Sequence, residues 1–164
     1  MRVEPGRYQF NRFLVSASSD ASRAIVLRGD FEAGPFYDGR SEVLFVSAAV
    51  TPSPYAALSL TYTLSALHDI GRDRADSTTH LIAPTLRLAF DPNLQLTLFY
   101  QRHTAAELST WNARLSWEFR PLSYVYLVYN ERAPLAAASG LFTNMASVPT
   151  DRQLILKVTL NKQF

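Results

Sequence analysis

The amino-acid sequence predicts an all-β fold, an antiparallel up-and-down meander of about eight or nine strands. Apolar and polar residues alternate with the period of two that a pleated strand imposes on its two faces. Segments rich in Pro, Asp, Asn and Ser separate the alternating stretches, as tight turns require. No segment has the periodicity of an amphipathic helix, and no apolar run approaches the roughly 18 residues of a membrane-spanning helix.

The alternation is clearest in four predicted strands, at residues 55–67, 94–103, 108–120 and 152–164. In the third of these, Trp111, Leu115 and Trp117 fall on one face of the strand. Arg114 and Glu118 fall on the opposite face. Each strand therefore has one apolar and one polar side.

Five further strands alternate less regularly, at residues 7–18, 22–32, 41–51, 78–90 and 123–131. Pro84 conflicts with the fourth of them because proline cannot donate a ladder hydrogen bond, so we expect a bulge or an irregular edge there. Residues 124–129 are apolar on both faces, and their orientation cannot be predicted.

The predicted connections are of two alternating kinds. Residues 18–21, 51–54, 91–93 and 120–123 form short turns, whereas residues 32–40, 68–78, 103–108 and 132–151 form longer loops. In a meander, alternate connections lie at the same end of the sheet. Short turns at one rim and longer loops at the other are typical of bacterial outer-membrane barrels.

The composition of the two faces favours a transmembrane β-barrel, or the C-terminal part of one. The polar faces are mostly Ser, Thr, Gln and Asn, which suits a hydrated lumen, and the candidate charged lumen residues are Arg87, Arg114, Glu118 and Lys157. The candidate lipid-facing or aromatic-girdle residues are Tyr100, Trp111, Leu115, Trp117, Phe119 and Phe164. Strand lengths of about 9–13 residues also match a tilted span of a bilayer. The alternative is a soluble ligand-binding β-barrel, which would turn its apolar face inward.

Charge and cysteine content exclude several classes of function. Lys and Arg number 16 against 14 Asp and Glu, for a net charge of +2, which is too balanced to predict nucleic-acid binding. Charged residues make up 18%, below the roughly 25% typical of soluble domains. The absence of cysteine excludes disulfides, thiolate zinc sites and a catalytic thiol.

The residues predict no catalytic, metal or cofactor site. His68, His80 and His103 lie near predicted strand ends and form no metal-binding motif, so we expect solvated histidines. A barrel hydrolase is the enzymatic alternative, but no Ser lies at the expected neighbouring position beside His103. The loop 69–76 lacks the spacing of a calcium loop, and Asp38 with Gly39 predicts a turn.

Six short motifs carry a family resemblance: Asn11-Arg12-Phe13, Gly29-Asp30-Phe31, Phe36-Tyr37-Asp38-Gly39, Thr79-His80-Leu81, Trp117-Glu118-Phe119-Arg120-Pro121 and Leu127-Val128-Tyr129-Asn130-Glu131-Arg132. In this order they resemble an uncharacterised bacterial family with a domain of unknown function. Its full-length members carry an N-terminal carbohydrate-binding module of family-nine type, followed by an outer-membrane barrel. The resemblance covers the end of that barrel and implies a location in the bacterial outer membrane. Any carbohydrate partner would belong to the upstream module.

Nine predicted strands do not close as an even-numbered barrel. We therefore expect residues 1–164 to be a single barrel segment, the C-terminal fragment of a longer outer-membrane protein, an expectation that the missing signal-peptide pattern at the start also favours. The alternative closes the second to ninth strands as an eight-stranded barrel. The expected partners are the lipid bilayer and, because the final strand ends on Phe164, the outer-membrane assembly machinery.

Overall fold

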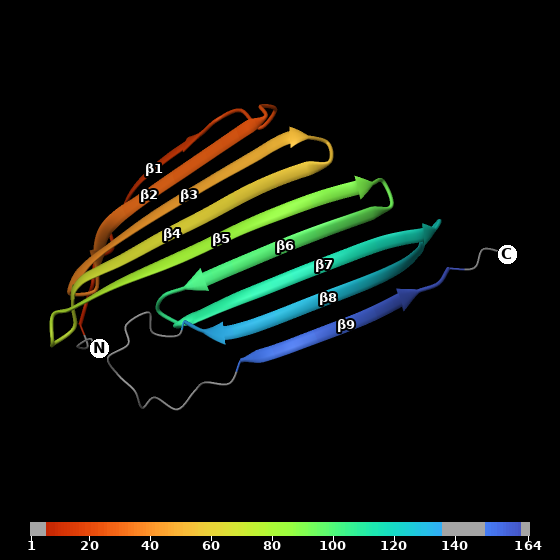
Figure 1. Cartoon of the computed structure of the whole chain (residues 1–164). Helices are drawn as coiled ribbons and strands as arrows, with labels where there is room; N and C mark the ends of the chain where they lie inside the picture. Colours follow the sequence, from red (N-terminus) through yellow and green to blue (C-terminus); the bar gives the residue numbers. More distant parts are fainter. Residues whose placement is uncertain (1–5, 136–149, 162–164) are drawn as a thin grey trace.

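The computed structural model describes residues 6–135 and 150–161, which form one antiparallel sheet (Figure 1). Its strands are β1 (Phe13–Ser18), β2 (Ile25–Phe36), β3 (Gly39–Ser53), β4 (Ala56–Ile70), β5 (Ala75–Asp91), β6 (Leu94–His103), β7 (Leu108–Arg120), β8 (Ser123–Pro134) and β9 (Asp151–Thr159). Every strand pairs with its neighbours in the sequence, from β1 to β9. The predicted all-β meander is therefore confirmed. No described helix is long and apolar enough to cross a membrane.

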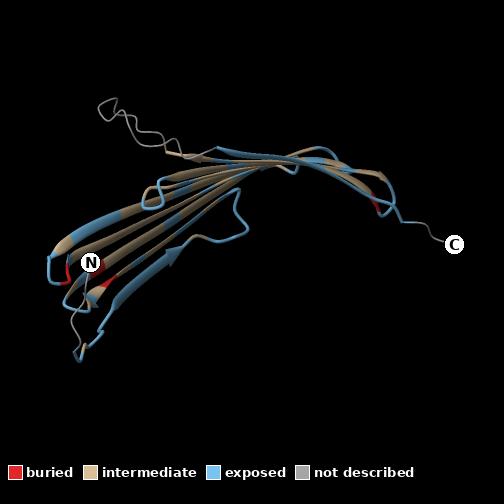
Figure 2. Ribbon diagram, turned by 90° about the horizontal axis from the view of Figure 1, so that it is seen from below, coloured by how far each residue is buried: buried red, intermediate tan, exposed pale blue. Residues whose placement is uncertain are grey.

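The sheet curves as an open arc, which Figure 2 shows from its edge. Within the described residues, β1 pairs only with β2, and β9 pairs only with β8. Neither β1 nor β2 forms a ladder with β9 in this part of the chain. The sheet consequently has two free edges, and the eight-stranded closure is not formed.

One end of the sheet carries short turns that contain proline, and we call it the proline-turn end. Its turns are residues 54–55, 92–93 and 121–122, together with the connection 19–24. Asp91 Oδ1 accepts hydrogen bonds from the backbone N–H groups of Asn93 and Leu94. Asp20 accepts two from Ser22, which lower the pKa of its carboxyl below the usual value. These are the turn roles that short Asp side chains favour.

The opposite end, which we call the loop end, has shorter connections than the sequence predicts. The predicted loops 32–40 and 68–78 are mostly strand, joined by the turns 37–38 and 71–74, and the third loop contracts to residues 104–107. Arg40, for example, stands opposite His68 in the ladder between β3 and β4. Charged residues and Gly, Pro and Asp interrupt the alternation in these segments, a pattern that predicts loops although the backbone continues to pair. Most of the fourth predicted loop, residues 136–149, lies outside the described residues.

Two strand boundaries differ from the prediction, and the structure shows the form of the irregularity expected at Pro84. β1 begins at Phe13, so residues 7–12 are not strand, and β9 ends at Thr159. Pro84 lies within β5, where the ladder to β6 omits residues 83–84 and then resumes in the same register. The expected irregularity at Pro84 is therefore an interrupted ladder, because proline has no N–H to donate.

Most of the buried residues in the described part of the chain lie at the loop end, whereas Ser123 is buried at the proline-turn end. Ile70 is 1% exposed, and Gly71 donates its backbone N–H to Asp38 Oδ1 at 3.0 Å. A Cβ atom on Gly39 would stand 2.1 Å from the backbone oxygen of His68. The predicted turn at Asp38 and Gly39 thus packs closely where β3 begins and β4 ends.

Candidate functional site

The register places the apolar sides of all the strands on one surface of the sheet. One row of directly paired residues crosses eight strands, and its members are Ile25, Val50, Leu58, Leu86, Leu98, Ala113, Tyr129 and Leu154. Paired residues in an antiparallel sheet share a face. We call this surface the apolar face and the opposite surface the polar face.

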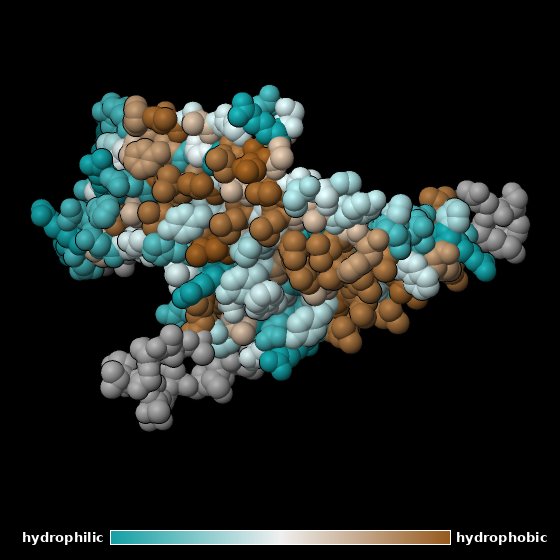
Figure 3. Space-filling view, turned by 45° about the horizontal axis from the view of Figure 1, so that its top comes forward, coloured by the Kyte–Doolittle hydropathy of each residue, from teal (hydrophilic) through white to brown (hydrophobic). Residues whose placement is uncertain are grey.

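Within residues 6–135 and 150–161, no second layer packs on the apolar face. Ala33 and Ile70 are the only buried hydrophobic residues among those described. At regular ladder positions, the exposed large hydrophobic residues belong to the apolar face except Leu14 and Ile155, which lie in the edge strands. In Figure 3, hydrophobic side chains gather over the middle of the sheet, with hydrophilic ones towards its ends. Extended exposed apolar surfaces are typical of sites that contact a membrane or another protein.

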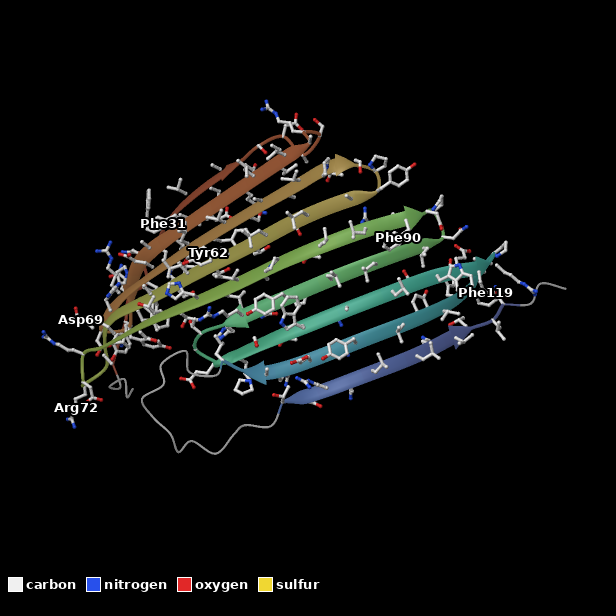
Figure 4. The ribbon with its side chains drawn as sticks, in the orientation of Figure 1. Phe31, Tyr62, Asp69, Arg72, Phe90 and Phe119 are labelled. Carbon is white, nitrogen blue, oxygen red and sulfur yellow. The ribbon has the colours of Figure 1, made fainter. Side chains whose placement is uncertain are left out.

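The predicted girdle residues lie along this face. Trp111 and Tyr100 are paired across β6 and β7, with ring centroids 4.5 Å apart, and Leu115 lies between Trp111 and Trp117 on β7. Phe119 sits in a bulge beside Trp117, with ring centroids 5.9 Å apart, and Figure 4 places it at the proline-turn end. Phe164 lies outside the described residues.

Polar residues bound the apolar band towards the loop end. On β8 the band runs through Val125, Leu127 and Tyr129 and stops at Glu131. The Tyr129 hydroxyl donates to Glu131, and Arg152 Nη2 lies 3.3 Å from Glu131 Oε1. This ion pair ends the band on β8 and β9 together.

The apolar band is staggered relative to the hydrogen-bond register. It is centred on Leu127 in β8 and on Gly29 in β2, where it runs from Ile25 to Ala33. The row through Gly29 continues through Val46, Tyr62, Ile82, Arg102 and Ser109 to Ala133. Ala133 is six residues beyond Leu127, and β2 is six strands away from β8. The band therefore shifts by about one residue per strand.

This stagger fixes the angle between the strands and the band. One residue rises about 3.3 Å along a strand, and strands lie about 4.8 Å apart, so the strands tilt by about 35° from the normal of the band. On β4 the band from Leu58 to Ala66 covers eight residue steps, which project to a height of about 22 Å. Transmembrane barrels have strand tilts of about 35–45° and apolar bands about 25 Å tall.

Side-chain exposure indicates that the polar face is the concave one. On β4, Leu58 and Leu60 on the apolar face are 50% and 45% exposed. Ser59 and Thr61, their neighbours on the polar face, have smaller side chains, yet a smaller fraction of each is exposed. Side chains crowd together on the inside of a curved sheet and splay apart on the outside. The apolar face is therefore the outer side of the arc in Figure 2.

The four predicted charged residues all lie on the polar face of β5 to β9. Arg87 and Arg114 occupy one row, separated by Thr97. Lys157 lies in the next row, opposite Tyr126. Glu118 lies nearer the proline-turn end, where its Oε1 accepts the backbone N–H of Leu122 at 2.8 Å.

Sequence reasoning missed two tyrosines on the polar face. Tyr124 and Tyr126 are stacked with ring centroids 5.7 Å apart, and the Arg114 guanidinium lies 4.9 Å from the centre of the Tyr126 ring. With Gln95, Ser116 and the charged residues Arg114 and Glu118 they line a hollow of about 220 Å³. The run 124–129 gave no orientation because it is apolar at every position, so only the register of β8 separates its two faces.

The three histidines lie apart and make separate contacts. His68 Nδ1 is 3.7 Å from Asp76, His103 Nδ1 accepts the backbone N–H of Ala106, and His80 Nδ1 lies 2.9 Å from the Tyr62 hydroxyl. His80 is half-buried, and its backbone N–H donates to the Thr104 hydroxyl, so it is not the solvated histidine that we expected. Its place in the ladder of β5, inside the strand rather than at its end, explains the difference. In the described ranges, no group of three His, Cys, Asp or Glu residues could hold a metal ion.

Comparison with other proteins adds no assignment to this geometry. No protein-family model matches the chain, and no curated protein matches its sequence. The resemblance to the barrel family, and the carbohydrate partner that it implies for an upstream module, stay predictions.

Proposed function

We propose that the chain is a segment of an outer-membrane β-barrel with a structural or transport-related role and no catalysis of its own. Its apolar face contacts the hydrocarbon of the bilayer, and its polar face lines a hydrated lumen. The observation that carries the proposal is the staggered apolar band, because its slope matches the strand tilt of transmembrane barrels. The bilayer and the outer-membrane assembly machinery are the partners that this function requires.

The exposure of the apolar face argues against the soluble ligand-binding barrel. A soluble barrel buries its apolar side chains on the inner, concave side, where they enclose the ligand. Here Trp111 and Trp117 are each 49% exposed on the outer side of the arc. In water that surface would favour association rather than a stable monomer.

The strand directions support a larger barrel than this sheet alone. Each strand is antiparallel to its neighbours, so β1 and β9 run in the same direction. Pairing them would create a parallel contact, whereas an odd number of additional strands closes the sheet with antiparallel pairs only. Unpaired edge groups are costly in hydrocarbon. We therefore include closure by further strands of a longer polypeptide in the proposal.

The proposed function predicts that the protein fractionates with outer membranes and needs detergent to stay dispersed. The physical reason is the continuous exposed band on β2 to β9, which water cannot solvate favourably. The measurement is membrane fractionation of the full polypeptide, followed by size-exclusion chromatography with and without detergent. A folded, monodisperse protein in plain buffer would contradict the proposal.

A further inference from the structure

We infer that the polar face of β5 to β9 is an anion-selective surface, formed by Arg87, Arg114 and Lys157. The inference rests on the proposed function, because it assumes that this face lines a hydrated lumen. It goes further by naming the class of solute, small hydrated anions, and the residues that select them. We call the three residues the cationic strip.

The cationic strip lacks carboxylate partners. No salt bridge joins Arg87, Arg114 or Lys157 to a carboxylate of the described residues. The carboxylates of this part of the polar face lie at its two ends. Glu118 is bonded to the turn at Leu122, and Asp151 stands opposite Arg132 in the ladder between β8 and β9. Glu118 is the nearest carboxylate, because it lines the same hollow as Arg114. Three cations against this one carboxylate leave the middle of the surface with a net positive charge.

The polar face of β2 is different, and it provides an internal comparison. Arg28 Nε lies 2.8 Å from Asp30, and Arg12 Nη1 lies 2.7 Å from Glu32. Each cation there is neutralised by an acidic residue close to it. The polar face of β2 therefore pairs its cations with carboxylates, whereas the polar face of β5 to β9 leaves the cationic strip without such ion pairs.

The spacing of the cationic strip suits a belt of charge that mobile ions cross, rather than one tight binding site. Arg87 and Arg114 are two strands apart in one row, and Lys157 is two strands beyond Arg114 in the next row, so neighbours are separated by about 10–12 Å. This is close to the Debye length of about 8–10 Å at moderate salt, so the fields of neighbouring charges overlap. Because the apolar band shifts by about one residue per strand, Arg114 and Lys157 lie at about the same depth, and Arg87 lies about two residues nearer the proline-turn end. An anion that crosses the lumen at this depth would meet a favourable potential along a stretch of its wall.

Polar residues flank the cationic strip, and the ring of Tyr126 positions one of its cations, Arg114. The Arg114 guanidinium lies over the Tyr126 ring, which fixes its position without cancelling its charge. Thr97 and Gln95 on β6, and Ser116 on β7 itself, lie beside it on the polar face. Their amide and hydroxyl groups can replace part of the hydration of a passing anion.

The test is a measurement of ion selectivity in planar lipid bilayers, using the folded full polypeptide and a gradient of potassium chloride. We expect the reversal potential to show that chloride permeates more readily than potassium. In the variant Arg87→Gln, Arg114→Gln, Lys157→Gln, the chloride-to-potassium permeability ratio should fall by at least about twofold. Each single substitution should lower it by a smaller amount, which keeps the test valid if the triple variant does not fold.

The matched control is the double variant Arg28→Gln, Asp30→Asn, which removes a paired cation and its partner and should leave the ratio unchanged. Absence of conductance, a preference for potassium, or a ratio that the strip variants do not alter would overturn the inference. If one of these results is obtained but the protein folds only in detergent or lipid, the inference is wrong and the proposed membrane barrel is still supported. Folding in plain buffer would instead contradict the proposed function itself.

Discussion

Replacing Leu115 with Arg is expected to lower the free energy of unfolding in lipid vesicles by about 2–4 kcal/mol. Leu115 lies in the middle of the apolar band, paired with Leu96 on one side and Leu127 on the other. In the proposed barrel, an arginine there would face hydrocarbon near the midplane, where a cation loses its hydration. The measurement is reversible unfolding of the full polypeptide in vesicles, followed by tryptophan fluorescence.

Ser116→Arg is the matched control for this substitution. Ser116 is the next residue on β7 and lies on the polar face, so the same charge would stay hydrated. We expect it to cost much less than Leu115→Arg. A one-residue error in register would exchange the two faces, so equal costs or a larger cost at Ser116 would contradict the assignment of the faces.

Gly39→Ala is expected to destabilise the loop end by about 1–3 kcal/mol, through overpacking. The added Cβ would stand 2.1 Å from the His68 backbone oxygen and 2.8 Å from that of Asp69. Backbone atoms of a paired strand cannot rotate away as a side chain could, so β3 and β4 would have to separate. Unfolding in vesicles, as for Leu115→Arg, measures the cost.

The control for Gly39 is Gly29→Ala, in the middle of β2. Its Cβ would find no atom closer than the Phe45 backbone oxygen at 3.9 Å, which is ordinary contact. Alanine also loses less backbone freedom on folding than glycine does, so this variant should be as stable as the original protein or slightly more stable. Similar losses in the free energy of unfolding at both positions would show that the close backbone approach at Gly39 is not what makes alanine unfavourable there.

The alternation of residue types was enough to predict the strands and their faces wherever one face is consistently apolar. Leu94, Leu96 and Leu98 on β6 illustrate this, because a period of two in the sequence maps directly onto the pleat. The nine-stranded meander followed from such segments and from the turns between them. The charged candidates Arg87, Arg114 and Lys157 were likewise placed on a common face by the same period.

The sequence failed where the physical contrast between the faces disappears. At the loop end, β3 and β4 continue past the apolar band, and residues such as Arg40 and His68 are polar although they are paired. Alternation then carries no signal, and the segments resemble loops. In residues 124–129 the opposite occurs, since Tyr124 and Tyr126 are as apolar as the residues between them. Stagger across the sheet is also invisible in a single strand, because it depends on the register between strands.

The stagger is the observation that supports the proposed membrane barrel. A flat sheet in water has no reason to shift its apolar residues by about one position per strand. A tilted barrel must do so, because a band parallel to the membrane plane crosses each strand at a different residue. The polar limit at Glu131 on β8 and the one at Glu42 on β3 follow this slope.

Quenching of tryptophan fluorescence by lipids with brominated acyl chains tests most directly whether the apolar face meets the bilayer. Trp111 and Trp117 are the two tryptophans of the chain, and both lie on that face. In vesicles, the single-tryptophan variants Trp111→Phe and Trp117→Phe should each be quenched by brominated lipid and protected from aqueous iodide. With both replaced, Tyr126→Trp on the polar face should show the reverse. Iodide quenching of Trp111 and Trp117 without any effect of brominated lipid would contradict the membrane-facing assignment.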